Sequence, residues 1–238
     1  MGKDFIARKS RYCLWLKDIL PSELKKYPKI MERVKNVREF RLSCPSPDTN
    51  HYADKPTFPV RLRYYSEDRI NPALALPKVS SQNRRYIPME VIDADVIAGS
   101  KLFLIPDISL YHFGVLTSNV HMAWMRTVCG RLKSDYSYAS NVVYNTFPWP
   151  EPTAQQRQKI EQTAQAILDA RALYPDSSLA DLYDELTMPP ELRKAHRQND
   201  MAVMQAYGFT KGSEAYKSEA ACVAELMQRY QKLCEEQK

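Results

Sequence analysis

The chain has 238 residues, a mass of 27.6 kDa and a formal net charge of +6 at pH 7. Its 44 % hydrophobic and 26 % charged residues are typical of a globular protein with one large domain or two smaller ones. Six glycines exclude a collagen-like or glycine-rich chain, and no apolar run approaches the ~20 residues of a membrane span. The polar opening Met1–Asp4 does not resemble a signal peptide, so we expect a cytoplasmic protein with no membrane partner.

The first 60 residues predict a strand, a helix and a loop. Residues 5–16 finish in a strand-like apolar and aromatic run. Pro21 opens a predicted helix that continues to about Leu42, because its apolar residues recur at helical spacing. Residues 44–59 contain four prolines and are expected to form a loop.

The middle of the chain predicts short strands, then a helix, then another strand. The strands are expected at Val60–Tyr65, Leu74–Ser80, Tyr86–Ile92 and Lys101–Ile105. Apolar residues between Leu116 and Val128 recur at i, i+3 and i+4, with Thr117 or Ser118 as N-cap. Residues 136–144 again read as a strand, and the proline-rich stretch at 147–152 is the predicted domain boundary.

The last third of the chain predicts helices only. Thr153 and Gln156 form a capping-box pattern, and the residues at 175–178 end that helix and cap a short one that runs to about Leu186. Pro189 suits a first helical residue, Gly208 suits the position after a helix end, and Ser213 is expected to start the last helix. The predicted fold class is therefore α+β, with a mixed α/β domain at 1–150 and a small helical bundle at 151–238.

Charge is distributed unevenly between these two parts. Residues 1–150 contain 23 Lys and Arg against 14 Asp and Glu, whereas residues 151–238 contain 11 against 14. The basic side chains of the first part are interleaved with Tyr, Ser and Asn, as in Arg61–Tyr65 and Arg131–Tyr138. Such residues contact phosphates and base edges, so the pattern favours a nucleic-acid partner over a merely solvated surface.

The patterns that could indicate a catalytic site are incomplete or badly placed. Asp18, Glu23 and Lys25 have the spacing of a metal-dependent nuclease, but the predicted helix start would point Glu23 and Lys25 in different directions. Met188–Glu191 lacks the Asn or Asp and the aromatic residue of an amino-methylating motif, and a double-proline helix start explains it. No glycine-rich loop follows a strand. We therefore expect no catalytic centre.

Cysteines and histidines give no sign of a metal site or a disulfide. The five cysteines form no CxxC pair, and the four histidines form neither HxxxH nor HExxH. We therefore expect reduced thiols and no bound metal.

Six short strings, in order along the chain, resemble the C-terminal part of one family. They are Tyr12–Leu16, Lys78–Ser81, Arg84–Pro88, His121–Arg126, Gly130–Tyr136 and Tyr144–Pro150. Together they resemble the target-recognition domain and helical tail of MmeI-like enzymes, which fuse restriction and adenine-N6 DNA methylation in one chain. The resemblance covers essentially the whole sequence.

This resemblance implies a specificity module without a catalytic centre. The S-adenosylmethionine site and the methyltransferase domain belong upstream in such proteins, in some cases with a fused endonuclease. The expected partners are double-stranded DNA and that upstream domain, with no small-molecule substrate.

The same resemblance nominates individual residues. Lys133 and Asp135 flank the serine of the Gly-Arg-Leu string, where the family reads a base pair, and Lys and Asp suit G·C because Lys donates to guanine while Asp accepts from cytosine. Further base-reading candidates are Lys101 with Ser137, and Lys78 with Ser100. Arg84, Arg85 and Arg131 are assigned to phosphate or structural contacts, and Arg126 as readily to a buried structural pair. A surface ion pair between Lys133 and Asp135 remains the alternative.

Sequence-specific reading of duplex DNA is thus the predicted function. The residues alone leave two other classes open. An RNA-binding module would show the same mixture of basic and aromatic residues, and a protein–protein adaptor could use the same positive field.

Overall fold

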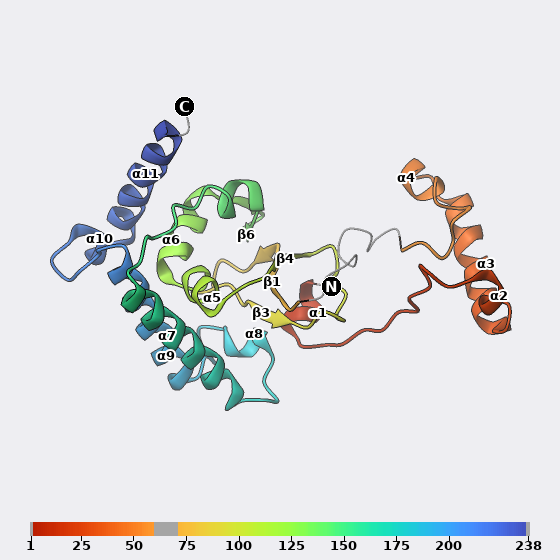
Figure 1. Cartoon of the computed structure of the whole chain (residues 1–238), viewed down its shortest axis with the longest axis horizontal. Helices are drawn as coiled ribbons and strands as arrows, with labels where there is room; N and C mark the ends of the chain where they lie inside the picture. Colours follow the sequence, from red (N-terminus) through yellow and green to blue (C-terminus); the bar gives the residue numbers. More distant parts are fainter. Residues whose placement is uncertain (1, 60–70, 237–238) are drawn as a thin grey trace.

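The computed structural model describes residues 2–59 and 71–236. Figure 1 shows helices α2 to α4 at one end, short strands in the middle and the longer helices α7, α9 and α11 at the other side. Two three-stranded antiparallel sheets lie among these helices, which confirms the α+β class. The predicted strand at 60–65 lies outside the described residues.

The N-terminal segment departs from the predicted strand. Helix α1 spans Gly2–Ile6, and the chain from Ser10 to Leu16 forms no strand. The expectation was wrong because a strand requires a hydrogen-bonded neighbour, and none pairs with this stretch in the described part of the chain.

The predicted helix from Pro21 to Leu42 is divided in two. Helix α2 (Pro21–Leu24) ends before Pro28, which opens α3 (Pro28–Ser43). Proline lacks an N–H and suits a first turn, so it restarts the helix where continuation would lose a hydrogen bond. The predicted loop beyond contains the short helix α4 (Pro47–Asn50), and Arg41 holds this loop by donating to three of its carbonyl oxygens.

The first sheet has strand order β3–β1–β4. Its strands are β1 (Ala73–Pro77), β3 (Glu90–Ile92) and β4 (Leu102–Pro106). Every residue of β1 is buried, as expected for a central strand with no solvent face. The predicted strand at 86–92 is shorter than expected, since only its last three residues pair with β1.

The second sheet has strand order β2–β6–β5. Strand β2 (Val79–Ser80) pairs with β6 (Asp135–Ser137), which forms a hairpin with β5 (Gly130–Leu132). The strand predicted to reach residue 144 ends at Ser137. A π-helix, η1 (Ser140–Tyr144), follows instead, and its Val143 carbonyl accepts a 3.2 Å hydrogen bond from Trp124 Nε1.

Two capped helices connect the sheets. Helix α5 (Leu110–Leu116) begins after a capping box at Ser109, and α6 (Asn119–Val128) begins after Ser118. The Ser118 side chain accepts from the His121 N–H, which confirms Ser118 as one of the two predicted N-caps.

The C-terminal helices largely follow their predicted boundaries. Thr153 and Gln156 form the predicted capping box of α7 (Ala154–Ala172), and Ser178 caps α8 (Leu179–Leu182). Gly208, with φ of +77°, follows α9 (Pro190–Ala206) as predicted, although Pro189 is the N-cap instead of the first helical residue. The predicted last helix is divided at Ser218 into α10 (Glu214–Lys217) and α11 (Glu219–Glu236).

One hydrophobic core extends across the proline-rich stretch at 147–152. Leu74 and Trp124 belong to the same cluster of buried side chains as Ile160 and Leu192. Trp124 and Phe147 belong to this cluster, and Tyr144 and Trp149 pack against it. The sheets therefore rest on the C-terminal helices, while the domain boundary at 150 stays a prediction.

Gly114 permits the close contact between α5 and α7. A Cβ there would lie 2.7 Å from Ile160 Cγ2, and the Gly114 carbonyl accepts a 2.7 Å hydrogen bond from Asn199 Nδ2. We expect Gly114→Ala to lower the free energy of unfolding by about 1–2 kcal/mol, because the added methyl overpacks the contact. Urea denaturation would measure it. Gly212→Ala is the matched control, since a Cβ at Gly212 has no neighbour within 4 Å, and an equal loss in both variants would contradict this account.

Candidate nucleic-acid interface

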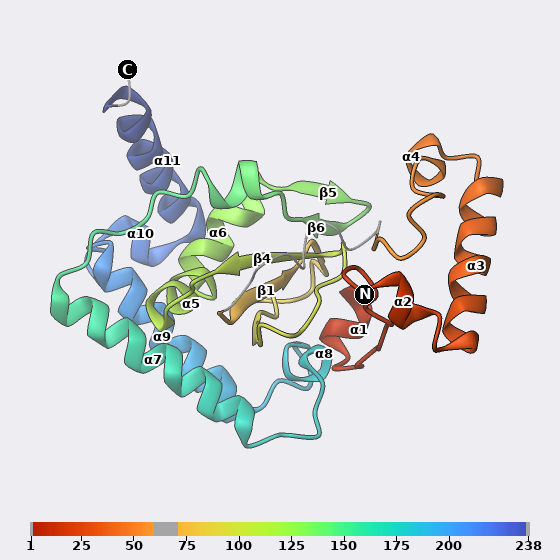
Figure 2. The same cartoon turned by 45° about the vertical axis from the view of Figure 1, so that its right-hand side comes forward.

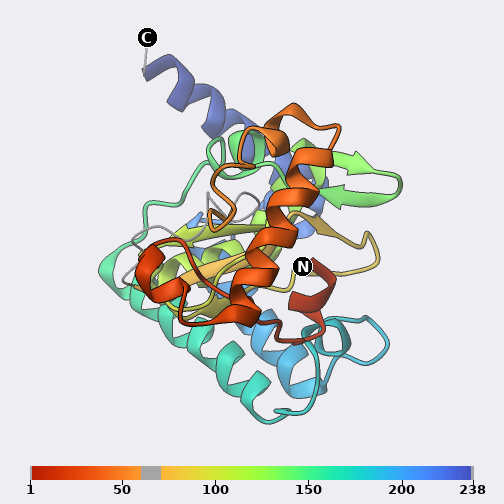
Figure 3. The same cartoon turned by 90° about the vertical axis from the view of Figure 1, so that its right-hand side faces the viewer.

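The β5–β6 hairpin presents the first pair of predicted base-reading residues. Its tight turn consists of Lys133 and Ser134, and the hairpin projects from one side of the molecule (Figure 3, light green). Lys133 has φ of +57°, a left-handed conformation that is uncommon for a residue with a Cβ. In the described part of the chain, no ion pair joins Lys133 to Asp135. The Lys133 side chain is exposed, and Asp135 is half-buried.

Strand alternation separates the two faces of this small sheet. Tyr136 is buried, and the Arg131 guanidinium stacks on its ring at 4.1 Å, so these opposed residues share the inward face. Asp135 and Ser137 must then lie on the outward face, because successive side chains of a strand alternate. Leu132, which is 58 % exposed and opposite Asp135, confirms that this face meets solvent.

The remaining base-reading candidates meet where the two sheets join. The Lys78 N–H donates to the Lys101 carbonyl at 3.0 Å, and the Tyr138 N–H donates to the Lys78 carbonyl at 2.8 Å. These bonds place Lys78, Lys101 and the adjoining Ser100 and Ser137 side by side, although they are far apart in sequence. The Lys78 ammonium lies 4.6 Å from the centre of the Phe103 ring. Lys133 lies apart from this group, at the far end of the hairpin.

The arginines assigned to phosphate or structural contacts differ in their partners within the protein. Arg131 donates to the Ser134 carbonyl at 3.1 Å and thereby braces the hairpin turn. Arg84 and Arg85 lie on the loop that directly follows β2, where Arg85 is exposed. Arg84 Nε is buried without a hydrogen-bond partner among the described residues. Arg126 makes a two-point contact with Glu219, both distances 2.9 Å, but the Glu219 side chain is 53 % exposed, so this is a surface pair and not the buried pair considered for Arg126.

Asp200 anchors the segment next to Arg85, and the sequence analysis did not identify it. The Tyr86 hydroxyl donates to Asp200 Oδ2 at 2.6 Å, and the Asn119 N–H donates to Oδ1 at 2.8 Å. Burial raises the pKa of Asp200 to about 6, although these donors and the nearby Arg85 and Arg126 act in the opposite direction. Asp200 thus links the helical part to the loop that carries Arg84 and Arg85.

A second buried group continues this network. His196 stacks on Tyr86 with ring centroids 4.2 Å apart, and its Nε2 lies 2.9 Å from the Tyr183 hydroxyl. Arg171 donates to that hydroxyl at 2.8 Å through Nε and to the Met89 carbonyl at 2.7 Å through its terminal nitrogen. The sequence contained one sign of this buried network, because His196 and Asp200 fall at i and i+4 on the apolar stripe of α9.

The rejected chemical motifs show no site geometry. Glu23 lies exposed on the short helix α2, while Asp18 precedes it in a turn. Met188–Glu191 leads into α9, with Pro189 as the N-cap and Pro190 as the first helical residue. Across residues 2–59 and 71–236, no group of three or more His, Cys, Asp or Glu could hold a metal ion. No helix in those ranges is long and apolar enough to cross a membrane.

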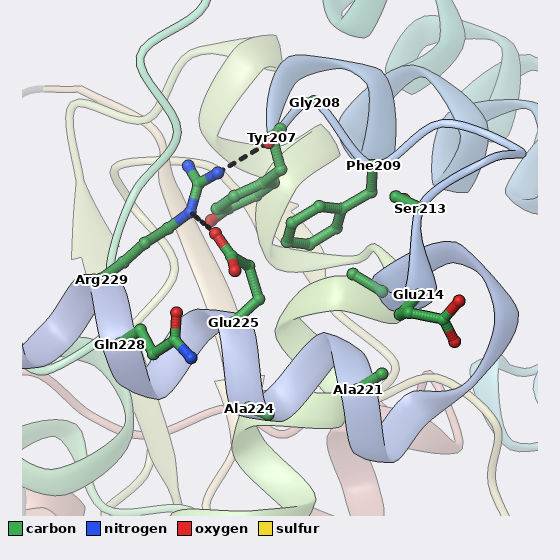
Figure 4. A pocket seen from close by; sticks show the side chains of 11 residues that line it. Tyr207, Gly208, Phe209, Ser213, Glu214, Ala221, Ala224, Glu225, Gln228 and Arg229 are labelled. Atoms are coloured by element: carbon green, nitrogen blue, oxygen red, sulfur yellow. Dashed lines mark hydrogen bonds and ion pairs between the residues drawn. The ribbon is translucent and has the colours of Figure 1, made fainter.

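A hollow lies between the end of α9 and α11, and the arginine beside it is bound by groups of the protein itself. Its volume is about 420 Å³, and Figure 4 shows Tyr207, Phe209, Glu225 and Arg229 around it. Arg229 donates to the Tyr207 carbonyl at 2.7 Å and to Glu225 at 3.3 Å, and its guanidinium lies over the Tyr207 and Phe209 rings. Arg229 is therefore already engaged by protein groups.

The comparisons with known protein families, with a curated relative and with a solved structure agree with one another. Residues 1–151 match the family described as the MmeI target recognition domain, and residues 152–237 match the MmeI C-terminal domain. DNA methyltransferase A of Bacillus subtilis (strain 168) is 36 % identical over 232 residues, which are 98 % of this chain and 25 % of that protein. The solved structure of the Type IIL restriction-modification enzyme MmeI in complex with DNA is 42 % identical, with a TM-score of 0.89 over 98 % of this chain and 30 % of that one. The chain therefore spans about a quarter to a third of these relatives.

Proposed function

The chain belongs to the MmeI target recognition and C-terminal domain families, and from this membership we propose that it reads a specific sequence in duplex DNA for a restriction–modification methyltransferase. The observation that carries the proposal is the exposed hairpin, with Lys133 at its tip and Asp135 on its outward face. The segments that adjoin this hairpin contain Lys78, Arg84, Arg85 and Lys101.

We propose major-groove readout as the mechanism. A two-stranded ribbon fits the major groove, where guanine presents O6 and N7 acceptors and cytosine presents an N4 donor. Lys133 would donate to guanine and Asp135 would accept from its paired cytosine. Lys101 with Ser137 and Lys78 with Ser100 would read neighbouring pairs, while Arg84 and Arg85 contact phosphates.

We place methyl transfer in the portion of the relatives that this chain does not span. The six glycines of the chain form no loop suited to S-adenosylmethionine, so the proposed adenine-N6 chemistry and its cofactor belong to that portion. The reader itself would position the target adenine, in the cytoplasm where reduced cysteines and DNA are both found.

The salt dependence of DNA binding tests the proposed function. For the 238-residue chain on duplex DNA, we expect log K to fall linearly with log salt, by about 0.9 for each phosphate neutralised. Fluorescence anisotropy with a labelled duplex would measure the slope, and single-stranded RNA would serve as competitor. A slope near zero would favour an adaptor, whereas stronger competition by RNA would favour an RNA reader; either outcome refutes the proposal.

A further inference from the structure

Residues 10–16 have the properties of a strand that lacks its sheet. All five side chains from Tyr12 to Leu16 are apolar or aromatic, so both faces of a strand here would need cover. Yet Tyr12 is 95 %, Leu14 55 % and Trp15 36 % exposed. From Ser10 to Trp15, no backbone group bonds to another backbone group in the described part of the chain. An apolar segment with unpaired backbone is a template for another strand.

The surrounding helices have little core of their own. We call residues 10–59 the arm; it contains α2, α3 and α4 (Figure 2). No arm residue belongs to, or packs against, either of the two hydrophobic clusters found among the described residues. Large apolar side chains of the arm are exposed instead, among them Leu20, Tyr27, Phe40 and Leu42. Exposed apolar surface of this extent marks a protein interaction site.

A groove in the arm joins the extended segment to α3. Its volume is about 710 Å³, and its lining includes Leu14 and Trp15 of the extended segment and Val34 and Val37 of α3. The extended segment, the groove and α3 thus form one continuous surface. A strand beside a helix is the arrangement of an α/β sheet unit, in which the helix covers the sheet that the strand joins.

We propose that Tyr12–Leu16 adds as a strand to an open sheet edge of a methyltransferase domain, with α3 packed on the same domain. The inference rests on the proposed function and identifies the surface by which the reader is held. The relatives indicate which domain binds this surface. This chain matches only 25 % of the Bacillus methyltransferase, and its residues 152–237 match a C-terminal domain. The unmatched portion of such relatives therefore precedes the segment equivalent to the arm.

Main-chain pairing explains why the partner is a sheet edge and not DNA. Strand addition would pair the N–H and C=O groups of this segment that have no backbone partner among the described residues, while alternate side chains fill apolar pockets. A DNA backbone offers phosphates, which do not complement Tyr12, Leu14 and Trp15. Arg33 and Arg41 also line the groove, but Arg41 is already bound to three loop carbonyl oxygens, and the cations of the predicted DNA interface adjoin the hairpin.

Hydrogen exchange in a fusion protein tests this docking. The matched region of the Bacillus methyltransferase is replaced in frame by this chain, and amide exchange is compared with that of the 238-residue chain alone. We expect the amides of residues 11–16 to exchange at least 100-fold more slowly in the fusion. Equal rates in the two proteins would overturn the proposal.

Two variants of the fusion add a matched comparison. Leu14→Asp is expected to abolish the protection of residues 11–16, whereas Leu186→Asp, at another highly exposed leucine, leaves it intact. An equal loss of protection at residues 11–16 in both variants would overturn the assignment of Tyr12–Leu16 as the docking strand. Protection of the isolated chain by duplex DNA, or by rising protein concentration, would instead assign the surface to DNA or to a second copy.

The proposed function can fail independently of this docking. Lys133→Glu in the fusion is expected to alter the DNA sequence preference and to leave the exchange of residues 11–16 unchanged. Protection of residues 11–16 without any DNA sequence preference would refute the proposed DNA-reading function and support the docking of the arm. A DNA sequence preference without this protection would refute the docking and support the DNA-reading function.

Discussion

Exchanging the two charges of the hairpin, in the double variant Lys133→Glu/Asp135→Arg, is expected to invert the preferred base pair at one position of the DNA site. The introduced glutamate would accept from cytosine N4, and the introduced arginine would donate to guanine O6 and N7, so G·C would become C·G. Binding to the original site should weaken by ~1–3 kcal/mol for each lost contact. Selection from a random duplex library, followed by anisotropy on both sites, would measure the change.

A matched charge exchange controls for altered net charge. Glu214 and Lys217 form an exposed ion pair on α10, in the helical part of the chain. The double variant Glu214→Arg/Lys217→Glu makes the same kind of exchange there and should leave the selected sequence unchanged. If the hairpin variant selects the wild-type sequence, the assignment of Lys133 and Asp135 is refuted.

Replacing Asp200 by asparagine is expected to make the protein more sensitive to acid. Burial raises the pKa of Asp200 to about 6, so the folded state retains a proton between about pH 4 and 6 that the unfolded state has released. This group therefore stabilises the fold at low pH, and its contribution is lost as the pH rises through 6. Burial lowers the pKa of His121 to about 3 and that of His196 well below its ordinary value, with the opposite effect on stability.

Between pH 4 and 6, the combined contribution of His121 and His196 to the pH dependence of the free energy of unfolding exceeds the opposite contribution of Asp200. We expect the free energy of unfolding of the wild type to fall as the pH is lowered from 6 to 4, because unfolding lets the histidines take up protons. Asp200→Asn removes the opposing contribution, so its slope should be steeper by ~1.4 kcal/mol per pH unit. Urea denaturation at several pH values would measure both slopes. Parallel slopes would show that Asp200 does not retain its proton in the fold.

Local sequence signals predicted helix starts well, because the atoms that decide them are neighbours in the chain. Ser118 and Thr153 cap their helices through N–H groups three residues away. Strands depended on partners elsewhere in the chain. Residues 10–16 have a strand-like sequence but no paired neighbour among the described residues, and residues 140–144 form a π-helix whose carbonyl binds the distant Trp124.

The candidate site was only partly predictable for a similar reason. The family resemblance located Lys133 and Asp135 within one short string, and the structure shows that string as a hairpin. It gave no indication that Arg131 braces the turn against Tyr136. The contact between Tyr86 and Asp200 joins residues 114 positions apart, which no local pattern reveals.

Guanine replacement in the DNA tests the central claim most directly, namely that Lys133 reads a guanine in the major groove. In the selected site, each guanine in turn is replaced by 7-deazaguanine, which lacks the N7 acceptor, and affinity is measured for the wild type and for Lys133→Ala. At one guanine, we predict a roughly tenfold loss for the wild type and no loss for Lys133→Ala. Equal losses in both proteins at every guanine would contradict the claim.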